Sequence, residues 1–248
     1  MNTFSSCLRC LILVGSLFLS EHGFAQITEG VIDYEVKVNL HRTLPPDRQE
    51  MKDMIPEFRT SKHQLFFKEQ ESLYKPVIED EEPMEANGPG VRIRMQQPNM
   101  EIYFDAAAQR RIIQEEFMGK DYIIDDSIVV RPWKFVAETR KVMGYDCQKA
   151  TYYDEQRKQN VTVWYTNKLR PFLGPETLNG LPGTVLLLDI NDGERVVTAQ
   201  SVVARALKKN ELKVPSKGIP ITRDAFQKMR EEQAQRMRAN GANVIIRN

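Results

Sequence analysis

The sequence predicts a mainly β protein of the α+β class, built on an antiparallel β-sheet with one short helix near the amino end and a second helix at the carboxyl end. Three observations predict this class. Apolar and polar residues alternate strictly over residues 32–40, and β-rich runs follow one another closely between residues 101 and 204. A Gln-, Glu- and Arg-rich stretch then follows at 223–239. Closely spaced strands with turns between them, rather than helices, predict antiparallel pairing.

Residues 1–25 are predicted to be a cleavable secretory signal peptide. Arg9 supplies a positive start, residues 11–19 are apolar, and the small residues Gly23 and Ala25 precede a cleavage point before Gln26. The apolar run is far shorter than the ~20 residues of a membrane-spanning helix. We therefore expect an exported protein of the periplasm or the cell surface, with no transmembrane segment in the mature chain.

Charge and cysteine content exclude several classes of protein. A formal net charge of +1 gives no electrostatic case for nucleic-acid binding. Cys7 and Cys10 lie in the signal peptide, before its apolar run, which argues against a lipid anchor. Only Cys147 remains after cleavage, so no internal disulfide is expected. The mature chain is long enough for one sizeable core, and we divide it into a β domain at 26–218 and a helical tail at 219–248.

The first strand is predicted at residues 32–40. Its alternation places Ile32, Tyr34, Val36, Val38 and Leu40 on one face, which should lie on a core while the other face is wet.

A short helix is expected next, because Met51, Met54, Ile55 and Phe58 recur at helical spacing after a pair of prolines. Core packing is the expected role of this methionine stripe. Pro56 should end or kink the helix.

The remaining strands are short runs rich in β-branched and aromatic residues, separated by turn residues. The turn Asn191-Asp192-Gly193 between two such runs predicts a β-hairpin. Residues 79–85 are acidic, and we interpret them as a solvated loop because they lack the spaced Asp, Asn and Gly order of a calcium-binding loop. The predicted strands are 64–68, 72–77, 101–105, 111–117, 121–124, 133–138, 148–153, 161–166, 184–190 and 195–204.

The tail helix is predicted at 223–239, with Thr222 as its amino-terminal cap and Gly241 as its stop. Phe226, Met229 and Met237 form one thin apolar stripe. Such a helix either packs on the sheet or projects to meet a partner, and packing is the expected outcome because docking stabilises most helices.

No pattern of catalytic, cofactor-binding or metal-ligating residues is found, and we expect no cofactor and no metal. His41 and His63 are the only histidines after residue 25. A thiol enzyme would need one of them beside Cys147. Strand alternation places Cys147 with Lys149 and Thr151, or inward if a bulge intervenes, and we interpret it as a structural cysteine. A catalytic pair of carboxylates remains an alternative, because acidic residues are plentiful and their spacing in the sequence does not reveal which of them meet in space.

Two stretches carry a resemblance to a known family. The first, at 133–150, holds Trp133-Lys134 and the run Gly144-Tyr145-Asp146-Cys147-Gln148-Lys149-Ala150, and the second, at 163–186, holds Trp164-Tyr165-Thr166, Gly174-Pro175 and Gly180-Leu181-Pro182-Gly183. In the order and spacing of these motifs the chain is similar to the GLPGLI family of exported Bacteroidetes proteins. Thr184 departs from the name motif, which has leucine at this position, and gives up apolar area there. The residues that carry the resemblance are Trp133, Gly144, Tyr145, Cys147, Lys149, Trp164, Tyr165, Gly174, Pro175, Gly180, Leu181, Pro182 and Gly183.

The Gly-Leu-Pro-Gly motif itself has a structural interpretation. Residues 181–184 fit a type II turn, in which Pro182 sets the first central φ and Gly183 takes a positive φ. The turn would then lead into the buried strand at 184–190. The resemblance implies an envelope location. The strand-rich layout is also similar to LolA-like envelope carriers, which implies a sheet curved into an open half-barrel that cups an acyl chain or a partner.

Three functions are compatible with these observations. The favoured one is a non-enzymatic envelope protein that binds an apolar ligand, such as a lipid, or an outer-membrane protein on the curved sheet. The second is a structural or assembly protein that acts through its carboxy-terminal helix and acidic loop. The third is a hydrolase that uses Cys147 or a pair of carboxylates.

Overall fold

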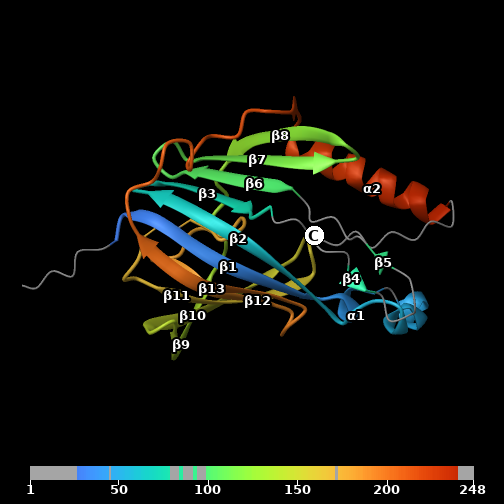
Figure 1. Ribbon diagram of the computed structural model, residues 1–248, viewed down its shortest axis with the longest axis horizontal. Coiled ribbons are helices and arrows are strands. Elements are labelled where there is room, and N and C mark those ends of the chain that lie inside the picture. The colour runs from blue at the N-terminus through green and yellow to red at the C-terminus, as the bar shows by residue number, and fades with distance from the viewer. Residues whose placement is uncertain are drawn as a thin grey trace, which may run out of the picture.

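The computed structural model describes residues 27–44, 46–78, 84–85, 92–93, 99–170 and 173–239 (Figure 1). The predicted signal peptide, Gly241 and nearly all of the acidic stretch at 79–85 lie outside these residues.

One large, open, curved sheet of 12 strands dominates the structure and confirms the mainly β prediction. Its spatial order is β14-β8-β7-β6-β3-β2-β1-β13-β12-β11-β10-β9, and its neighbouring strands pair antiparallel except β14 with β8. Two further short strands, β4 (Met84–Glu85) and β5 (Arg92–Ile93), pair with each other. The strands of the large sheet are β1 (Glu29–Asn39), β2 (Phe58–Lys68), β3 (Glu71–Pro76), β6 (Met100–Asp105), β7 (Arg110–Phe117), β8 (Lys120–Ser127), β9 (Lys134–Val142), β10 (Tyr145–Asp154), β11 (Gln159–Thr166), β12 (Thr184–Ile190), β13 (Arg195–Ala204) and β14 (Ile219–Pro220).

Among the described residues, three helical segments accompany the sheet. Near the amino end, α1 (Leu40–Thr43) is followed by a 3-10 helix, η1 (Pro46–Asp53), and the carboxy-terminal helix is α2 (Arg223–Ala239). The predicted methionine stripe is wrong in its extent, because only Met51 lies in η1. Phe58 instead begins β2, where it pairs with Asn39 of β1, so strand pairing overrides the helical spacing. Ile55 is buried as predicted, but Met54 is 58% exposed.

The two faces of the sheet are covered by different segments. We call the face that carries Ile32, Leu65 and Ile113 the inner face; it holds most of the core. On the opposite, outer face, a smaller apolar cluster around Phe66 is covered by Leu207 of the segment that follows β13. The prediction that the second face of β1 is exposed to solvent is therefore wrong in part, because β1 buries Ile32 on the inner face and Val31 on the outer face.

The connection between β11 and β12, residues 167–183, covers the inner face. We call it the motif loop because it carries Gly174-Pro175 and the Gly-Leu-Pro-Gly motif. Four of its leucines are buried in the main core, each no more than 7% exposed. These residues are Leu169, Leu173, Leu178 and Leu181.

The tail helix covers the inner face at the other end of the sheet, alongside β7 and β8 (Figure 1). Phe226 of α2 is 4% exposed and meets the ring of Phe117 at 5.8 Å and that of Tyr122 at 5.4 Å between centroids. Met229 packs against the same core. Phe226 and Met229 of the apolar stripe are therefore used within the chain rather than presented to a partner.

Candidate functional site

The motif loop reaches the sheet through glycines that leave no room for a side chain. Gly174 joins Pro175 through a cis peptide bond and has a φ of +90°. A Cβ atom on Gly174 would lie 3.0 Å from Leu65 Cδ1, and one on Gly180 would lie 2.9 Å from Val130 Cγ1. Gly174 thus allows the loop to approach Leu65 of the main core closely, and Gly180 allows it to approach Val130 in the segment between β8 and β9.

Gly183 has a different role from the one predicted. Its φ lies outside the left-handed region, so the predicted type II turn at 181–184 is wrong. A Cβ atom on Gly183 would lie only 2.2 Å from the carbonyl oxygen of Thr166, at the end of β11. Gly183 is therefore required by the close approach of two backbone segments, where the loop returns to the sheet.

Hydrogen bonds from the sheet hold the motif loop in place. Trp133 Nε1 donates to the carbonyl oxygen of Asn179 at 2.8 Å, and its ring meets Tyr152 edge-on at 4.7 Å. Ser72 Oγ donates to the carbonyl of Leu173 at 3.3 Å. At the far end of the loop, Thr184 Oγ1 donates to Leu169 at 3.1 Å. The departure from leucine at position 184 thus supplies a buried hydrogen bond.

The other motif residues lie on the β9–β10–β11 part of the sheet. Gly144 has a φ of +81° in the β9–β10 turn, and Tyr145 begins β10. Lys149 pairs with Glu138 at 3.0 Å and lies 5.7 Å from the ring of Trp164. These residues stabilise strand pairing. The Tyr165 hydroxyl donates to Gln148 Oε1 at 2.8 Å. In the motif loop, Leu181 is buried and Pro182 is exposed.

Cys147 points into the core. A bulge between Gln148 and Lys149 shifts the register of β10 against β9, so Cys147 shares the main core with Ala150 rather than alternating with Lys149. Burial raises the pKa of its thiol to about 11, and the thiol donates to the carbonyl of Tyr145 at 3.6 Å. At neutral pH the group is therefore a protonated thiol, not a nucleophilic thiolate.

The two candidate histidines lie in other parts of the structure. A ring nitrogen of His41 is 3.0 Å from the carbonyl oxygen of Ile55, and His63 stacks on Tyr74 with 5.1 Å between ring centroids. Strand β2, which carries His63, is separated in the sheet from β10 by β1, β13, β12 and β11. Burial lowers the pKa of His63 to about 4.

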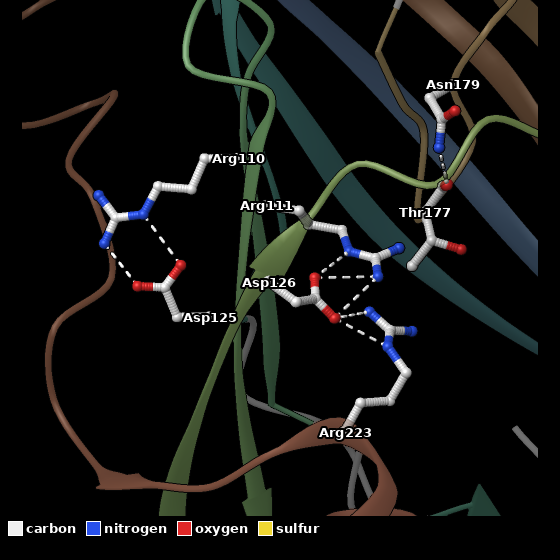
Figure 2. Close-up of polar contacts among 7 residues, drawn as sticks. All are labelled: Arg110, Arg111, Asp125, Asp126, Thr177, Asn179 and Arg223. Carbon is white, nitrogen blue, oxygen red and sulfur yellow. Dashed lines mark hydrogen bonds and ion pairs between the residues drawn. The ribbon is translucent and has the colours of Figure 1, made fainter.

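A buried arginine, which no sequence motif indicated, forms the centre of a polar cluster on the inner face (Figure 2). The side chain of Arg111 on β7 is 1% exposed. Its Nε donates to Asp126 Oδ1 at 3.1 Å and its Nη2 to Oδ2 at 3.2 Å. Arg223, at the start of α2, donates to the same carboxylate through Nε at 2.8 Å and through Nη2. Two guanidinium groups therefore share one carboxylate.

One nitrogen of Arg111 makes no hydrogen bond. Its Nη1 is buried and points away from Asp126, toward the part of the motif loop that carries Thr177 (Figure 2). Burial is the main cause of a lowered Arg111 pKa, and the charges of Arg131 and Arg157 lower it further. An unpaired donor on a buried cation is costly, because its desolvation is not offset.

A second polar group lies under the same loop. Glu176 forms an ion pair with Arg195 of β13, with 2.5 Å between Oε1 and Nη2. The hydroxyl of Tyr74 and the Nε of Arg195 are buried without a hydrogen-bond partner. Burial raises the pKa of Tyr74 well above its ordinary value, with the charge of Glu176 adding to the effect, so the hydroxyl stays protonated.

The unsatisfied atoms thus gather around one segment. Glu176, Thr177 and Asn179 of the motif loop lie next to the two groups, and buried polar atoms normally find partners in protein or in bound molecules. The arrangement is suited to holding a polar or anionic group between the loop and the sheet. The buried atoms without a partner around this segment are Tyr74 Oη, Arg111 Nη1, Arg131 Nε, Asn179 Oδ1 and Arg195 Nε.

Metal-ligand clusters and membrane-spanning helices are both absent from the described residues. Histidine, cysteine and carboxylate side chains there form no group of three or more that could hold a metal ion. Of the helices in that part of the chain, none has the length and apolar content needed to cross a membrane.

Comparison with known proteins gives a likeness of fold. No family model and no curated protein matches the chain. Two solved structures of PNGF-II, in C2 and P21 crystal forms, superpose with TM-scores of 0.53 and 0.50 at 17% and 16% sequence identity. The matches cover 81% and 82% of this chain but 32% and 33% of the other. The chain therefore spans about a third of the length of PNGF-II and shares the fold of that part.

Proposed function

We propose that the chain is an exported, non-enzymatic envelope protein of the GLPGLI family, and that it binds an amphiphilic, lipid-like ligand at the inner face of its half-barrel sheet. The observation that carries the proposal is the set of buried polar atoms without partners beneath the motif loop, within an otherwise apolar interior. An apolar chain with a polar end group matches both properties of such an interior.

The two segments that cover the inner face, the motif loop and α2, favour a binding site that can open by their movement. The motif loop and α2 are single segments laid over the sheet, and neither contributes a strand to its centre. Moving either one would expose apolar side chains of β7, β8 and the central strands without breaking a strand pairing of the main sheet. The layout is similar in this respect to a LolA-like carrier, in which a curved sheet holds an acyl chain.

A thiol enzyme is disfavoured by the position of Cys147. The thiol is fully buried, its pKa is raised, and the contacts described for His41 and His63 are with other residues. A nucleophilic cysteine needs an accessible thiolate beside a base. These observations support a binding function without catalysis.

An outer-membrane protein partner is the second candidate, and strand β9 favours it. In the described part of the chain β9 pairs only with β10, so its other edge is open, and Phe135 on this strand is 61% exposed. An open edge can accept a strand from another chain. The tail helix supports a partner less well, because Phe226 is buried within the chain.

Native mass spectrometry of the mature protein, purified from its own envelope without denaturation, tests the proposal. We expect a species with an added lipid-sized mass, and the same molecule should be recovered in an organic extract of the sample. The matched control is the same protein unfolded, extracted and refolded, which should show the apo mass alone. If the native sample contains only apo protein and the extract is empty, the carrier proposal is wrong, and cross-linking in intact cells would then test the partner.

A further inference from the structure

The polar cluster around Arg111, between the motif loop and the start of α2, holds more arginine than carboxylate. Arg111 and Arg223 share Asp126, and the neighbouring Arg230 of α2 is neutralised by Glu115 at 2.8 Å. One positive charge therefore lacks a counter-charge in this cluster. Arg111 is the buried member of the two, at 1% exposed against 40% for Arg223, and a buried cation without a full counter-charge is unfavourable unless an anion accompanies it.

A third guanidinium adds to this excess. Arg131 belongs to the segment between β8 and β9, which lies beside the motif loop: the backbone nitrogen of Arg131 lies 3.8 Å from where a Cβ on Gly180 would be. Its guanidinium is 6.0 Å from the ring of Tyr152, and its Nε is buried without a partner. Arg131 is close enough to Arg111 to lower the pKa of Arg111 by charge repulsion.

Two of the unpaired donors, Arg111 Nη1 and Arg131 Nε, therefore belong to cations at this cluster. Arg111 Nη1 is directed away from its carboxylate and toward the loop, and its side chain is 1% exposed (Figure 2). A guanidinium that already uses two nitrogens on Asp126 can still donate its remaining N–H groups to a second oxyanion. Carboxylate, phosphate and sulfate groups are the acceptors that this geometry suits.

We infer that the site takes an anionic oxygen group, a carboxylate, phosphate or sulfate, which accepts hydrogen bonds from Arg111 Nη1 and Arg131 Nε beneath the motif loop. The inference rests on the proposed function and names the polar end of its ligand. The anion arrives either as the head group of an amphiphile or as a free ion, and both share this chemistry.

Calorimetric titration of the extracted, refolded protein with three probes tests the inference: decanoate, uncharged 1-decanol and inorganic phosphate. The variants are Arg131→Gln, which leaves Asp126 paired, and Arg111→Lys, which keeps a charge for Asp126 but removes the Nη1 donor. The matched control is Arg110→Gln, because Arg110 precedes Arg111 on β7 but points to the outer face, where it pairs with Asp125.

We expect decanoate to bind the wild-type protein more tightly than decanol does. Loss of one charge-assisted hydrogen bond should weaken decanoate binding about tenfold in both inner-face variants. Decanol binding should be unchanged in those variants, and Arg110→Gln should bind all probes as the wild type does. Circular dichroism of each variant checks that it is folded.

The other outcomes separate the inference from the proposed function. If decanol binds as tightly as decanoate and Arg131→Gln changes neither, the anion inference is wrong and the carrier function stands. If phosphate binds in an Arg131-dependent manner while neither amphiphile binds, the anion site stands, its ligand is a free ion, and the carrier function is wrong. Binding of none of the probes would overturn both.

Discussion

Arg111 on β7 lies directly opposite Asp126 on β8, and the two form a bidentate ion pair on the inner face of the sheet. The residues just before them, Arg110 and Asp125, form the same kind of pair on the outer face, at 2.6 Å. The side chains differ in exposure, 1% for Arg111 against 50% for Arg110. Two chemically identical pairs, one residue apart, thus sit in different environments (Figure 2).

Asp126→Asn should destabilise the protein far more than Asp125→Asn. Removing the inner carboxylate leaves Arg111 and Arg223 without a counter-charge, at a cost of about 3–5 kcal/mol. The outer pair is solvated, so Asp125→Asn should cost less than about 1 kcal/mol. Urea unfolding of the two variants measures the difference. Equal losses of unfolding free energy in the two variants would mean that the inner ion pair is as exposed to solvent as the outer one.

Replacing glycine by asparagine should cost less stability than replacing it by alanine at Gly144, but not at Gly183. At Gly144, φ is +81° and the space is open, so alanine should cost about 1–2 kcal/mol and asparagine, which tolerates positive φ, less. At Gly183 the obstacle is the Thr166 carbonyl, 2.2 Å from a Cβ atom. There alanine should cost about 1–3 kcal/mol or more, and asparagine should not relieve it. Recovery of stability by Gly183→Asn relative to Gly183→Ala would contradict the close-approach explanation.

Phe226→Ala tests whether α2 stabilises the domain. Phe226 is 4% exposed between Phe117 and Tyr122, so truncation should cost about 3–5 kcal/mol in the free energy of unfolding. Phe135 on β9 is 61% exposed, and Phe135→Ala is the matched control, with an expected cost below about 1 kcal/mol. Chemical denaturation monitored by circular dichroism gives both values. A tail that projects freely would make the two variants equally stable.

His63 should make the protein less stable in mild acid. Its pKa is about 4 in the folded chain, against 6.5 for an ordinary histidine, mainly because of burial, with the charges of Arg195 and Arg59 acting in the same direction and that of Glu176 against it. Protonation therefore favours the unfolded chain. The stability contributed by neutral His63 is present above pH 6.5 and is lost as pH falls toward 4.

Between pH 7 and pH 5 this loss should amount to about 2 kcal/mol. The measurement is the free energy of unfolding in urea at both pH values, for the wild type and for His63→Gln. The variant should lose less stability than the wild type by about that amount, since glutamine does not titrate. If the two proteins show the same pH dependence, His63 does not titrate with a lowered pKa.

Cys147 should not react with thiol reagents in the folded protein. Its pKa of about 11 and complete burial keep it protonated and inaccessible at pH 7.5. In a chain that begins at Gln26, where Cys147 is the one cysteine, Ellman's reagent should give no signal until urea unfolds the protein, and then one thiol. Cys147→Ala should retain ligand binding and lose about 1–2 kcal/mol of stability from the removed sulfur. Rapid labelling of the native protein would revive the thiol hypothesis.

The strands were predictable because their signals are local. Alternation at Ile32, Tyr34 and Val36 and the turn at Asn191-Asp192-Gly193 reflect side-chain period and turn chemistry, which act over a few residues. The structure has a strand in β1 and a hairpin between β12 and β13 at these places. The carboxy-terminal helix has the predicted bounds, since its cap and composition are local as well. Phe58 was mispredicted because its strand partner, Asn39, is distant in the sequence.

The candidate site depended on tertiary structure. Arg110 and Arg111 are adjacent arginines in the sequence, and only the register of β7 with β8, together with the covers over one face, decides which of them is buried. The side chain of Cys147 likewise faces the core because of a bulge in β10. Gly183 is required because the backbone of Thr166 passes close to it. The sequence by itself determined the strands, the terminal helix and the lack of familiar catalytic motifs, since these follow from short-range patterns. Tertiary structure alone decided which charges lose their water, because burial depends on segments far apart along the chain.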